Sequence, residues 1–131
     1  MRVALGIGCD RNAALPTLQA AVTQALVQAG LAHDAVAVCA SIDLKSDEAA
    51  LLQLCAQHGW PLWFYTAAQL ADIAVPNPSE VVLKFMGTPA VAEAAAMLAA
   101  NTGIAGLLVE KHKHCGLDGK NATVSIARLL E

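Results

Sequence analysis

Reactive and charged side chains come directly after the first apolar run of the chain. Val3 to Gly8 is almost continuously apolar, and Cys9, Asp10 and Arg11 follow it just before a helical pattern begins. A helix N-terminus and a nearby cation both favour the thiolate, so Cys9 is a candidate nucleophile or ligand contact. Open α/β sheets bind ligands beyond the carboxyl ends of their strands, which is where this spacing places Gly8, Cys9 and Arg11.

A second polar group follows the second apolar run. This group contains Ser41, Asp43 and Lys45. Because Asp43 and Lys45 are two residues apart, their side chains project from the same face of an extended chain. An aspartate in this position can act as a general base, and a lysine can bind a carboxylate. The alternative is a turn with a solvated ion pair, in which Ser46 caps the next helix.

Segment 76–80, Pro-Asn-Pro-Ser-Glu, has the residues of a helix start. Asn77 can cap the helix, Pro78 suits its first position, and Glu80 can reach back to the Asn77 amide. The amide groups at such an N-terminus also form an anion site, so Asn77 and Ser79 are candidate ligand contacts. Capping and anion binding are compatible with each other.

One basic cluster occupies 111–115, Lys-His-Lys-His-Cys. We expect a polar loop over 112–120 that brings Lys111 and Lys113 toward an anionic ligand, with a solvated hairpin as the alternative. Two histidines and a cysteine can bind a transition metal, but their spacing matches no strong zinc pattern. The sequence therefore predicts no metal site.

Gly6 and Gly8 resemble the start of a dinucleotide-binding fingerprint. The third glycine would fall at position 11, which is an arginine, and the lysine-bearing phosphate loop is absent. We therefore predict no cofactor. Close backbone packing and a tight turn are the simpler interpretation of these glycines.

The composition indicates one globular domain and argues against nucleic-acid binding. The 131 residues are 56% hydrophobic, 15% charged and 4% aromatic, and the net charge is −3. This length suffices for a single core without a metal or disulfide. Nucleic-acid binders need aromatic rings for stacking and a basic stripe, and this chain has few of the first and none of the second.

No segment is apolar and long enough to span a membrane, and the N-terminus shows no signal-peptide pattern. We therefore expect a cytoplasmic protein whose four widely spaced cysteines are free thiols. An apolar chain with little surface charge also favours self-association. A homodimer through an edge strand near the C-terminus is a further expectation.

Strands and helices must position these side chains. Apolar runs predict strands at 3–8, 35–41, 62–65, 107–111 and 122–130, and helical spacing predicts helices at 15–29, 47–58, 67–73, 77–86 and 88–100. Gly30 and Gly59 are expected to end the first two helices. The alternation predicts a single α/β domain over 1–131, a three-layer α/β/α sandwich of about five mostly parallel strands. The short connection before the last strand predicts an antiparallel strand at an edge.

Several motifs follow one another along nearly the whole chain. They are Gly6-Ile7-Gly8-Cys9 with Arg11, 40–45 (Ala-Ser-Ile-Asp-Leu-Lys) with Asp47-Glu48, 75–82 (Val-Pro-Asn-Pro-Ser-Glu-Val-Val), 87–96 (Gly-Thr-Pro-Ala-Val-Ala-Glu-Ala-Ala-Ala) and 122–128 (Ala-Thr-Val-Ser-Ile-Ala-Arg). In this order they resemble the CobE/CbiG C-terminal domain family of cobalamin biosynthesis. We expect a stand-alone, CobE-like member.

The resemblance implies a role in building the corrin ring. Its intermediates, the precorrins, are large apolar macrocycles ringed by carboxylates. A cleft edged by cations and helix N-termini suits such ligands. The cations in question are Arg11, Lys45, Lys111 and Lys113.

Three hypotheses follow from the resemblance. The first is a protein that binds a precorrin or corrinoid without chemistry. The second is a hydrolase of a precorrin-5A-type lactone, with Asp43 or Glu80 as base and Cys9 or Lys45 assisting, because CbiG-type proteins open such a lactone. The third is a module that supports another enzyme of the pathway.

Overall fold

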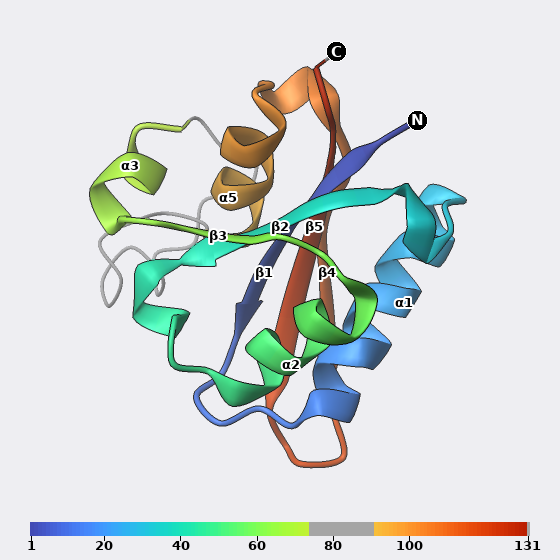
Figure 1. Cartoon of the computed structure of the whole chain (residues 1–131), viewed down its shortest axis with the longest axis vertical. Coiled ribbons are helices and arrows are strands. Elements are labelled where there is room, and N and C mark those ends of the chain that lie inside the picture. Colours follow the sequence, from blue (N-terminus) through green and yellow to red (C-terminus); the bar gives the residue numbers. More distant parts are fainter. Residues whose placement is uncertain (74–90, 131) are drawn as a thin grey trace.

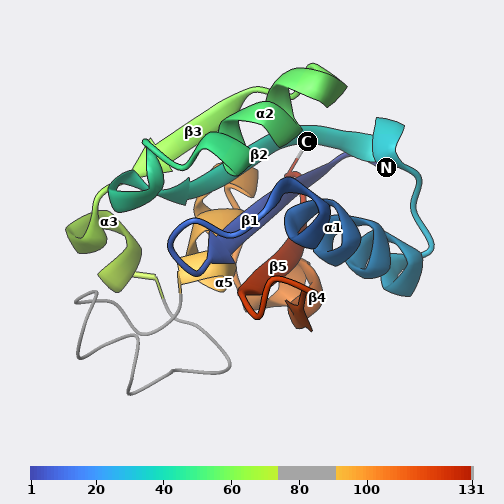
Figure 2. The same cartoon turned by 90° about the horizontal axis from the view of Figure 1, so that it is seen from below.

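The computed structural model describes residues 1–73 and 91–130. Helices lie on both faces of one central sheet (Figure 1 and Figure 2). The strands are β1 (Val3–Cys9), β2 (Val36–Ile42), β3 (Leu62–Tyr65), β4 (Leu107–Cys115) and β5 (Asn121–Arg128). The helices are α1 (Leu15–Ala29), α2 (Ala49–His58), α3 (Ala67–Ala71) and α5 (Val91–Ala100), and the short 3-10 turns are η1 (His33–Ala35), η2 (Asp43–Lys45) and η3 (Ile104–Gly106).

The five strands form one mixed sheet in the order β3-β2-β1-β5-β4. β1 and β2 are parallel, as are β2 and β3, whereas β5 is antiparallel to both β1 and β4. The α/β class and the reversed direction of the last strand are confirmed. The predicted edge position of that strand is wrong, because β5 lies between β1 and β4. The sheet is also less parallel than predicted, since only two of its pairings are parallel.

Side-chain burial explains this strand order. β5 is buried along most of its length, as a strand covered on both faces must be. β4 instead carries the exposed charges of Glu110, Lys111 and Lys113. Charged side chains on an edge strand discourage pairing with another chain. The sequence of β4 therefore suits the edge, and that of β5 suits the interior.

The basic cluster belongs to a strand and not to a loop. β4 extends to Cys115, so the loop predicted over 112–120 is wrong for its first four residues. The turn to β5 contains only 116–120. An edge strand tolerates polar side chains on its exposed positions, which is why these polar residues can continue the strand.

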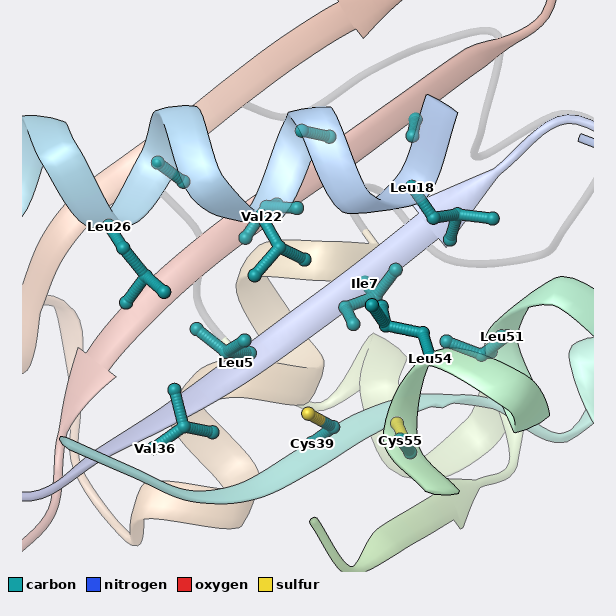
Figure 3. Packing of buried hydrophobic residues seen from close by; sticks show 14 of the residues in the cluster. Leu5, Ile7, Leu18, Val22, Leu26, Val36, Cys39, Leu51, Leu54 and Cys55 are labelled. Carbon is teal, nitrogen blue, oxygen red and sulfur yellow. The ribbon is translucent and has the colours of Figure 1, made fainter. Parts of the chain in front are cut away.

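One face of the sheet packs against α1 and α2 (Figure 3). The core there contains Leu5 and Ile7 of β1, Leu18, Val22 and Leu26 of α1, and Leu51 and Leu54 of α2. Each of these side chains is at most 1% exposed. The apolar spacing read from the sequence of α1 is therefore the spacing of its buried face.

The other face packs against α5, whose side chains on the sheet are alanines. Ala92, Ala95 and Ala96 are buried, and their small size lets the helix approach β1 closely. A Cβ atom added to Gly6 would lie 1.8 Å from the carbonyl oxygen of Ala92. The close-packing interpretation of Gly6 is thereby confirmed.

Local signals predicted most helix ends well. α1 occupies the predicted residues, and Gly30 and Gly59 end α1 and α2 with left-handed backbone, each at a φ of 69°. α2 begins at Ala49, two residues after the predicted start, so Asp47 and Glu48 lie outside its first turn. Their carboxylates bind Arg11, and that of Glu48 also accepts from the Asn12 amide. α3 is also shorter than predicted and ends at Ala71.

The N-terminus of α1 is capped from the far end of the chain. Ala14, at the N-cap position, has no side-chain oxygen to offer. Asp118 of the β4–β5 turn accepts hydrogen bonds from the Ala14 amide (2.8 Å) and from the Thr17 hydroxyl (2.9 Å). The turn and the start of α1 lie together at the lower end of Figure 1.

In the part of the chain that is described, no helix combines the length and the apolar character that a membrane span requires.

Candidate functional site

Two connecting segments meet at the carboxyl ends of β1 and β2. Gly6 is level with Ala40 in the parallel register, so Cys9 and Asp43 reach the same end of the sheet. The β1–α1 loop follows Cys9, and the segment 43–48 follows β2. We use the name strand-end cluster for five residues at this end of the sheet: Cys9 and Arg11 at and after the end of β1, and Ser41, Lys45 and Glu48 near and after the end of β2.

Arg11 binds the β2–α2 segment in three places. Its Nη1 atom lies 2.7 Å from Oδ1 of Asp47 and 2.8 Å from Oε1 of Glu48. Its Nη2 atom donates to the carbonyl oxygen of Leu44 at 2.9 Å. These contacts raise the pKa of the guanidinium, chiefly through its hydrogen bond to Asp47, and lower the pKa of the Asp47 carboxyl. Arg11 is thus already neutralised by protein groups.

Glu48 is a buried carboxylate that joins the two segments. Its side chain is 3% exposed. Both carboxylate oxygens accept from the backbone amide of Asn12, at 3.2 and 3.1 Å, and one also pairs with Arg11. Asn12 has a left-handed backbone with a φ of 63°, which turns its amide toward the β2–α2 segment. The sequence analysis missed this role, because nothing local links residues 12 and 48.

Lys45 is buried at the end of η2 and is 6% exposed. The described residues give its ammonium neither an ion pair nor a hydrogen bond. Its charge acts on the neighbouring Cys9 thiol and on Asp47. A cation on a largely buried side chain, with no acidic partner among the described residues, favours an anion nearby.

Cys9 ends β1 and is half-buried. The pKa of its thiol is raised to about 11, chiefly by burial. Lys45 and Arg11 lower this pKa, whereas the charges of Glu48 and Asp10 raise it. Desolvation outweighs the two cations and favours the thiol form at neutral pH. The role of Cys9 as a nucleophile or ligand contact stays a prediction. The thiol form is a weak nucleophile.

Ser41 and Asp43 differ sharply in exposure. Ser41 is fully buried, and its Oγ atom donates to the Ile7 carbonyl at 2.6 Å, which ties β2 to β1. Asp43 is exposed in η2, at the same end of the sheet as Cys9. Of the two, only Asp43 presents its side chain to solvent.

Lys113 lies on the same row of the sheet as Gly8. Thr123 of β5 pairs with Gly8 on one side and with Lys113 on the other. No described residue lies within 4 Å of a Cβ atom added to Gly8. Lys111 is exposed on the same edge strand. Both lysines are thus separated from the strand-end cluster by β5.

His112 holds β4 to α1. Its Nε2 atom lies 2.7 Å from Oε1 of Gln24, and its Nδ1 atom lies 2.7 Å from Nε2 of Gln28. Among the residues of 1–73 and 91–130, no three His, Cys, Asp or Glu side chains gather closely enough to hold a metal ion. The candidate residues Asn77, Ser79 and Glu80 lie outside the described residues.

The sequence between residues 3 and 127 matches the family model for the cobalamin synthesis G C-terminus. The chain is 37% identical to Protein CobE from Sinorhizobium sp over 109 residues, which covers 82% of this chain and 70% of that protein. It is 29% identical over 125 residues to cobalt-precorrin-5A hydrolase from Priestia megaterium. That match covers 95% of this chain and 32% of the hydrolase, so the chain spans about a third of that relative.

Two solved structures share the fold over most of their length. A crystal structure of CobE, from the cobalamin biosynthetic pathway, aligns with a TM-score of 0.84 at 34% identity and covers 98% of this chain and 91% of that one. The cobalamin biosynthesis protein chiG from Agrobacterium tumefaciens aligns with a TM-score of 0.67 at 29% identity, covering 98% of this chain and 99% of that one.

Proposed function

The chain belongs to the CbiG C-terminal domain family of cobalamin biosynthesis, and we propose on that basis that it binds a corrinoid intermediate at its strand-end cluster. The ligand is a precorrin or a related corrinoid that carries free carboxylates. Binding takes place without a chemical step. The site lies beyond the carboxyl ends of β1 and β2, where open α/β sheets receive ligands.

The setting of Lys45 is the observation that carries this proposal. Lys45 is 6% exposed, and within the described residues no acidic side chain pairs with it. Arg11, in contrast, is neutralised by two carboxylates. A ligand carboxylate would supply the counter-ion that Lys45 lacks, in a setting where a charged hydrogen bond is stronger than in water.

A lactone hydrolase is the second candidate, favoured by the similarity to cobalt-precorrin-5A hydrolase. Hydrolysis needs an activated nucleophile or a positioned base. The pKa of Cys9 is raised to about 11, and no described residue forms a hydrogen bond with its thiol. The described part of the site therefore supports binding better than covalent catalysis.

Titration of the purified protein with two corrinoids tests the proposal. Cobyrinic acid carries free carboxylates, and cobinamide carries amides in most of their places. We expect saturable binding of cobyrinic acid, with weaker binding of cobinamide. Lys45→Met keeps an unbranched apolar stem and removes the charge, so it should weaken cobyrinic acid binding by about tenfold or more.

Arg128→Met is the matched control. It removes the same charge at the opposite end of the sheet, where Arg128 pairs with Val3 at the start of β1, and should leave the affinity unchanged. Equal losses of cobyrinic acid affinity in the two variants would show that the ligand does not bind at the strand ends. Turnover of a precorrin lactone by this chain alone would favour the hydrolase. Absence of binding to every corrinoid and precorrin tested would leave only the supporting module.

A further inference from the structure

We propose that Glu48 is a positioning residue for this site. It ties the β1–α1 loop to the β2–α2 segment and takes up the charge of Arg11, so that Lys45 is the cation that meets the ligand. This inference rests on the proposed function for its ligand, but its structural part can be tested without one.

The contacts of Glu48 serve the neighbouring loop and not its own helix. Glu48 occupies the N-cap position of α2, yet its side chain forms no capping hydrogen bond there. The carboxylate instead accepts from the amide of Asn12 and pairs with Arg11. An N-cap side chain ordinarily satisfies an amide of its own helix. In this protein the Glu48 side chain does not cap α2 and instead joins the β2–α2 segment to the β1–α1 loop.

Asp47 shows what distinguishes Glu48. Both carboxylates bind the same Nη1 atom of Arg11, at 2.7 and 2.8 Å. The Asp47 side chain is 76% exposed, whereas that of Glu48 is 3% exposed. An exposed ion pair contributes little, because water and salt screen it. The buried Glu48 carboxylate, bound to the Asn12 amide and to the half-exposed Arg11, therefore holds the loop, and Asp47 supplements it.

We use the name Glu48 clamp for the contacts of Glu48 with the Asn12 amide and with Arg11. The Glu48 clamp also decides which cation is available to an anion. Lys45 lies three residues before Glu48, and the Glu48 amide donates to the Lys45 carbonyl at 3.0 Å. The Glu48 carboxylate turns away from Lys45 toward Asn12 and Arg11. Loss of the Glu48 charge would leave Arg11 bound only to the exposed Asp47 and the Leu44 carbonyl, and it would loosen the loop that follows Cys9. Ligand affinity should then fall, although Glu48 itself need not touch the ligand.

The experiment compares Glu48→Gln with Asp47→Asn, two variants that each remove one carboxylate from Arg11. The first readout is the affinity for cobyrinic acid. We expect a loss of about tenfold for Glu48→Gln and less than about twofold for Asp47→Asn, because only the first removes a buried carboxylate and its charged hydrogen bonds to the Asn12 amide. The melting temperature of each variant is measured alongside to confirm that it folds.

The second readout is Cys9, which needs no ligand. Removing the Glu48 charge alters the Cys9 thiol electrostatically, and this affects a small and a bulky reagent alike. Opening of the loop favours the bulky reagent. We therefore expect the ratio of Cys9 alkylation rates, bulky maleimide over iodoacetamide, to rise several-fold in Glu48→Gln and to stay unchanged in Asp47→Asn.

An unchanged alkylation rate ratio in folded Glu48→Gln would contradict the proposed role of Glu48. Equal changes of the rate ratio in Glu48→Gln and Asp47→Asn would contradict it as well. Should Glu48→Gln not fold, Glu48→Asp replaces it, since it retains the charge but shortens the reach to Asn12 and should raise the ratio. If the wild-type protein binds no corrinoid while the rate ratio responds as expected, the proposed function fails and the clamp stands. If the wild-type protein binds cobyrinic acid and Glu48→Gln binds it with the same affinity, the proposed function stands and only the positioning role of Glu48 fails.

Discussion

Cys9 shows how burial decides the chemistry of a single side chain. Its neighbours in the sequence, a cation and a helix start, favour a reactive thiolate. In the folded chain, desolvation is the largest influence and raises the pKa to about 11. Lys45 opposes this shift but does not cancel it. The thiol is therefore suited to lining a site and not to attacking a substrate.

A pH titration of Cys9 alkylation checks this assignment. With iodoacetamide, the rate at Cys9 should keep rising until the pH reaches about 11, because only the thiolate reacts. Lys45→Met removes the charge that most lowers this pKa, so it should slow the reaction at any pH below that value. Peptide mass spectrometry measures the alkylation of Cys9 separately from that of Cys115. Because Cys115 is exposed, its alkylation serves as an internal control for the reagent. A midpoint near the ordinary value of 9.0 would contradict the assignment.

At the scale of elements, helix α1 depends on a turn that is distant in sequence. Asp118 accepts from the Ala14 amide, and this bond is the main reason why the pKa of its carboxyl is lowered. A Cβ atom added to Gly116 would lie 2.0 Å from the Thr17 hydroxyl oxygen, so the turn also packs tightly on the helix. The β4–β5 turn is thus a structural support for the loop end of the sheet.

Asp118→Ala should lower the melting temperature by roughly several degrees, since loss of an N-cap destabilises a helix. The exposed Asp34 in η1 offers the control Asp34→Ala, with a smaller effect expected. Because the folded pKa of Asp118 is lowered from 3.8, its contribution is present above that pH and is lost as the pH falls through the folded pKa. The difference in melting temperature from wild type should therefore be constant above about pH 5 and shrink below pH 4. A difference that persists unchanged at low pH would argue against the cap.

At the scale of the whole molecule, Gly6 and Gly8 lie on the same face of the sheet and contribute differently to its packing. α5 lies on Gly6 so closely that no side chain fits between them. Two residues further along the same strand, no described residue lies within 4 Å of an added Cβ atom at Gly8. Gly6 is therefore needed for packing, whereas the described residues do not fill the position that a side chain at Gly8 would take.

Gly6→Ala should lower the free energy of unfolding by about 2 kcal/mol or more, because a methyl group would have to displace α5. Gly8→Ala should change it by less than about 1 kcal/mol. If the ligand uses the space at Gly8, the second variant should nevertheless weaken cobyrinic acid binding. Urea unfolding and ligand titration measure the two effects. Equal destabilisation by both variants would contradict this division of roles.

Local sequence determined the elements whose signals are local. α1 and β3 were predicted at their observed residues, because helical spacing, Gly30 and a short apolar run suffice to define them. The family resemblance also came from the sequence, because the order of its motifs is a property of the chain. The strand order could have been improved from the charges of Glu110, Lys111 and Lys113, which indicate an edge.

Tertiary structure decided the electrostatics of the site. Glu48 and Asn12 are 36 residues apart, and Asp118 and Ala14 are 104 residues apart, so no periodicity or local motif links them. The pKa of Cys9 and the low exposure of Lys45 depend on burial, and burial is a property of the packed chain. Residue types alone give the charges available for a site. Only packing determines which of those charges neutralise each other and which one is left for a ligand.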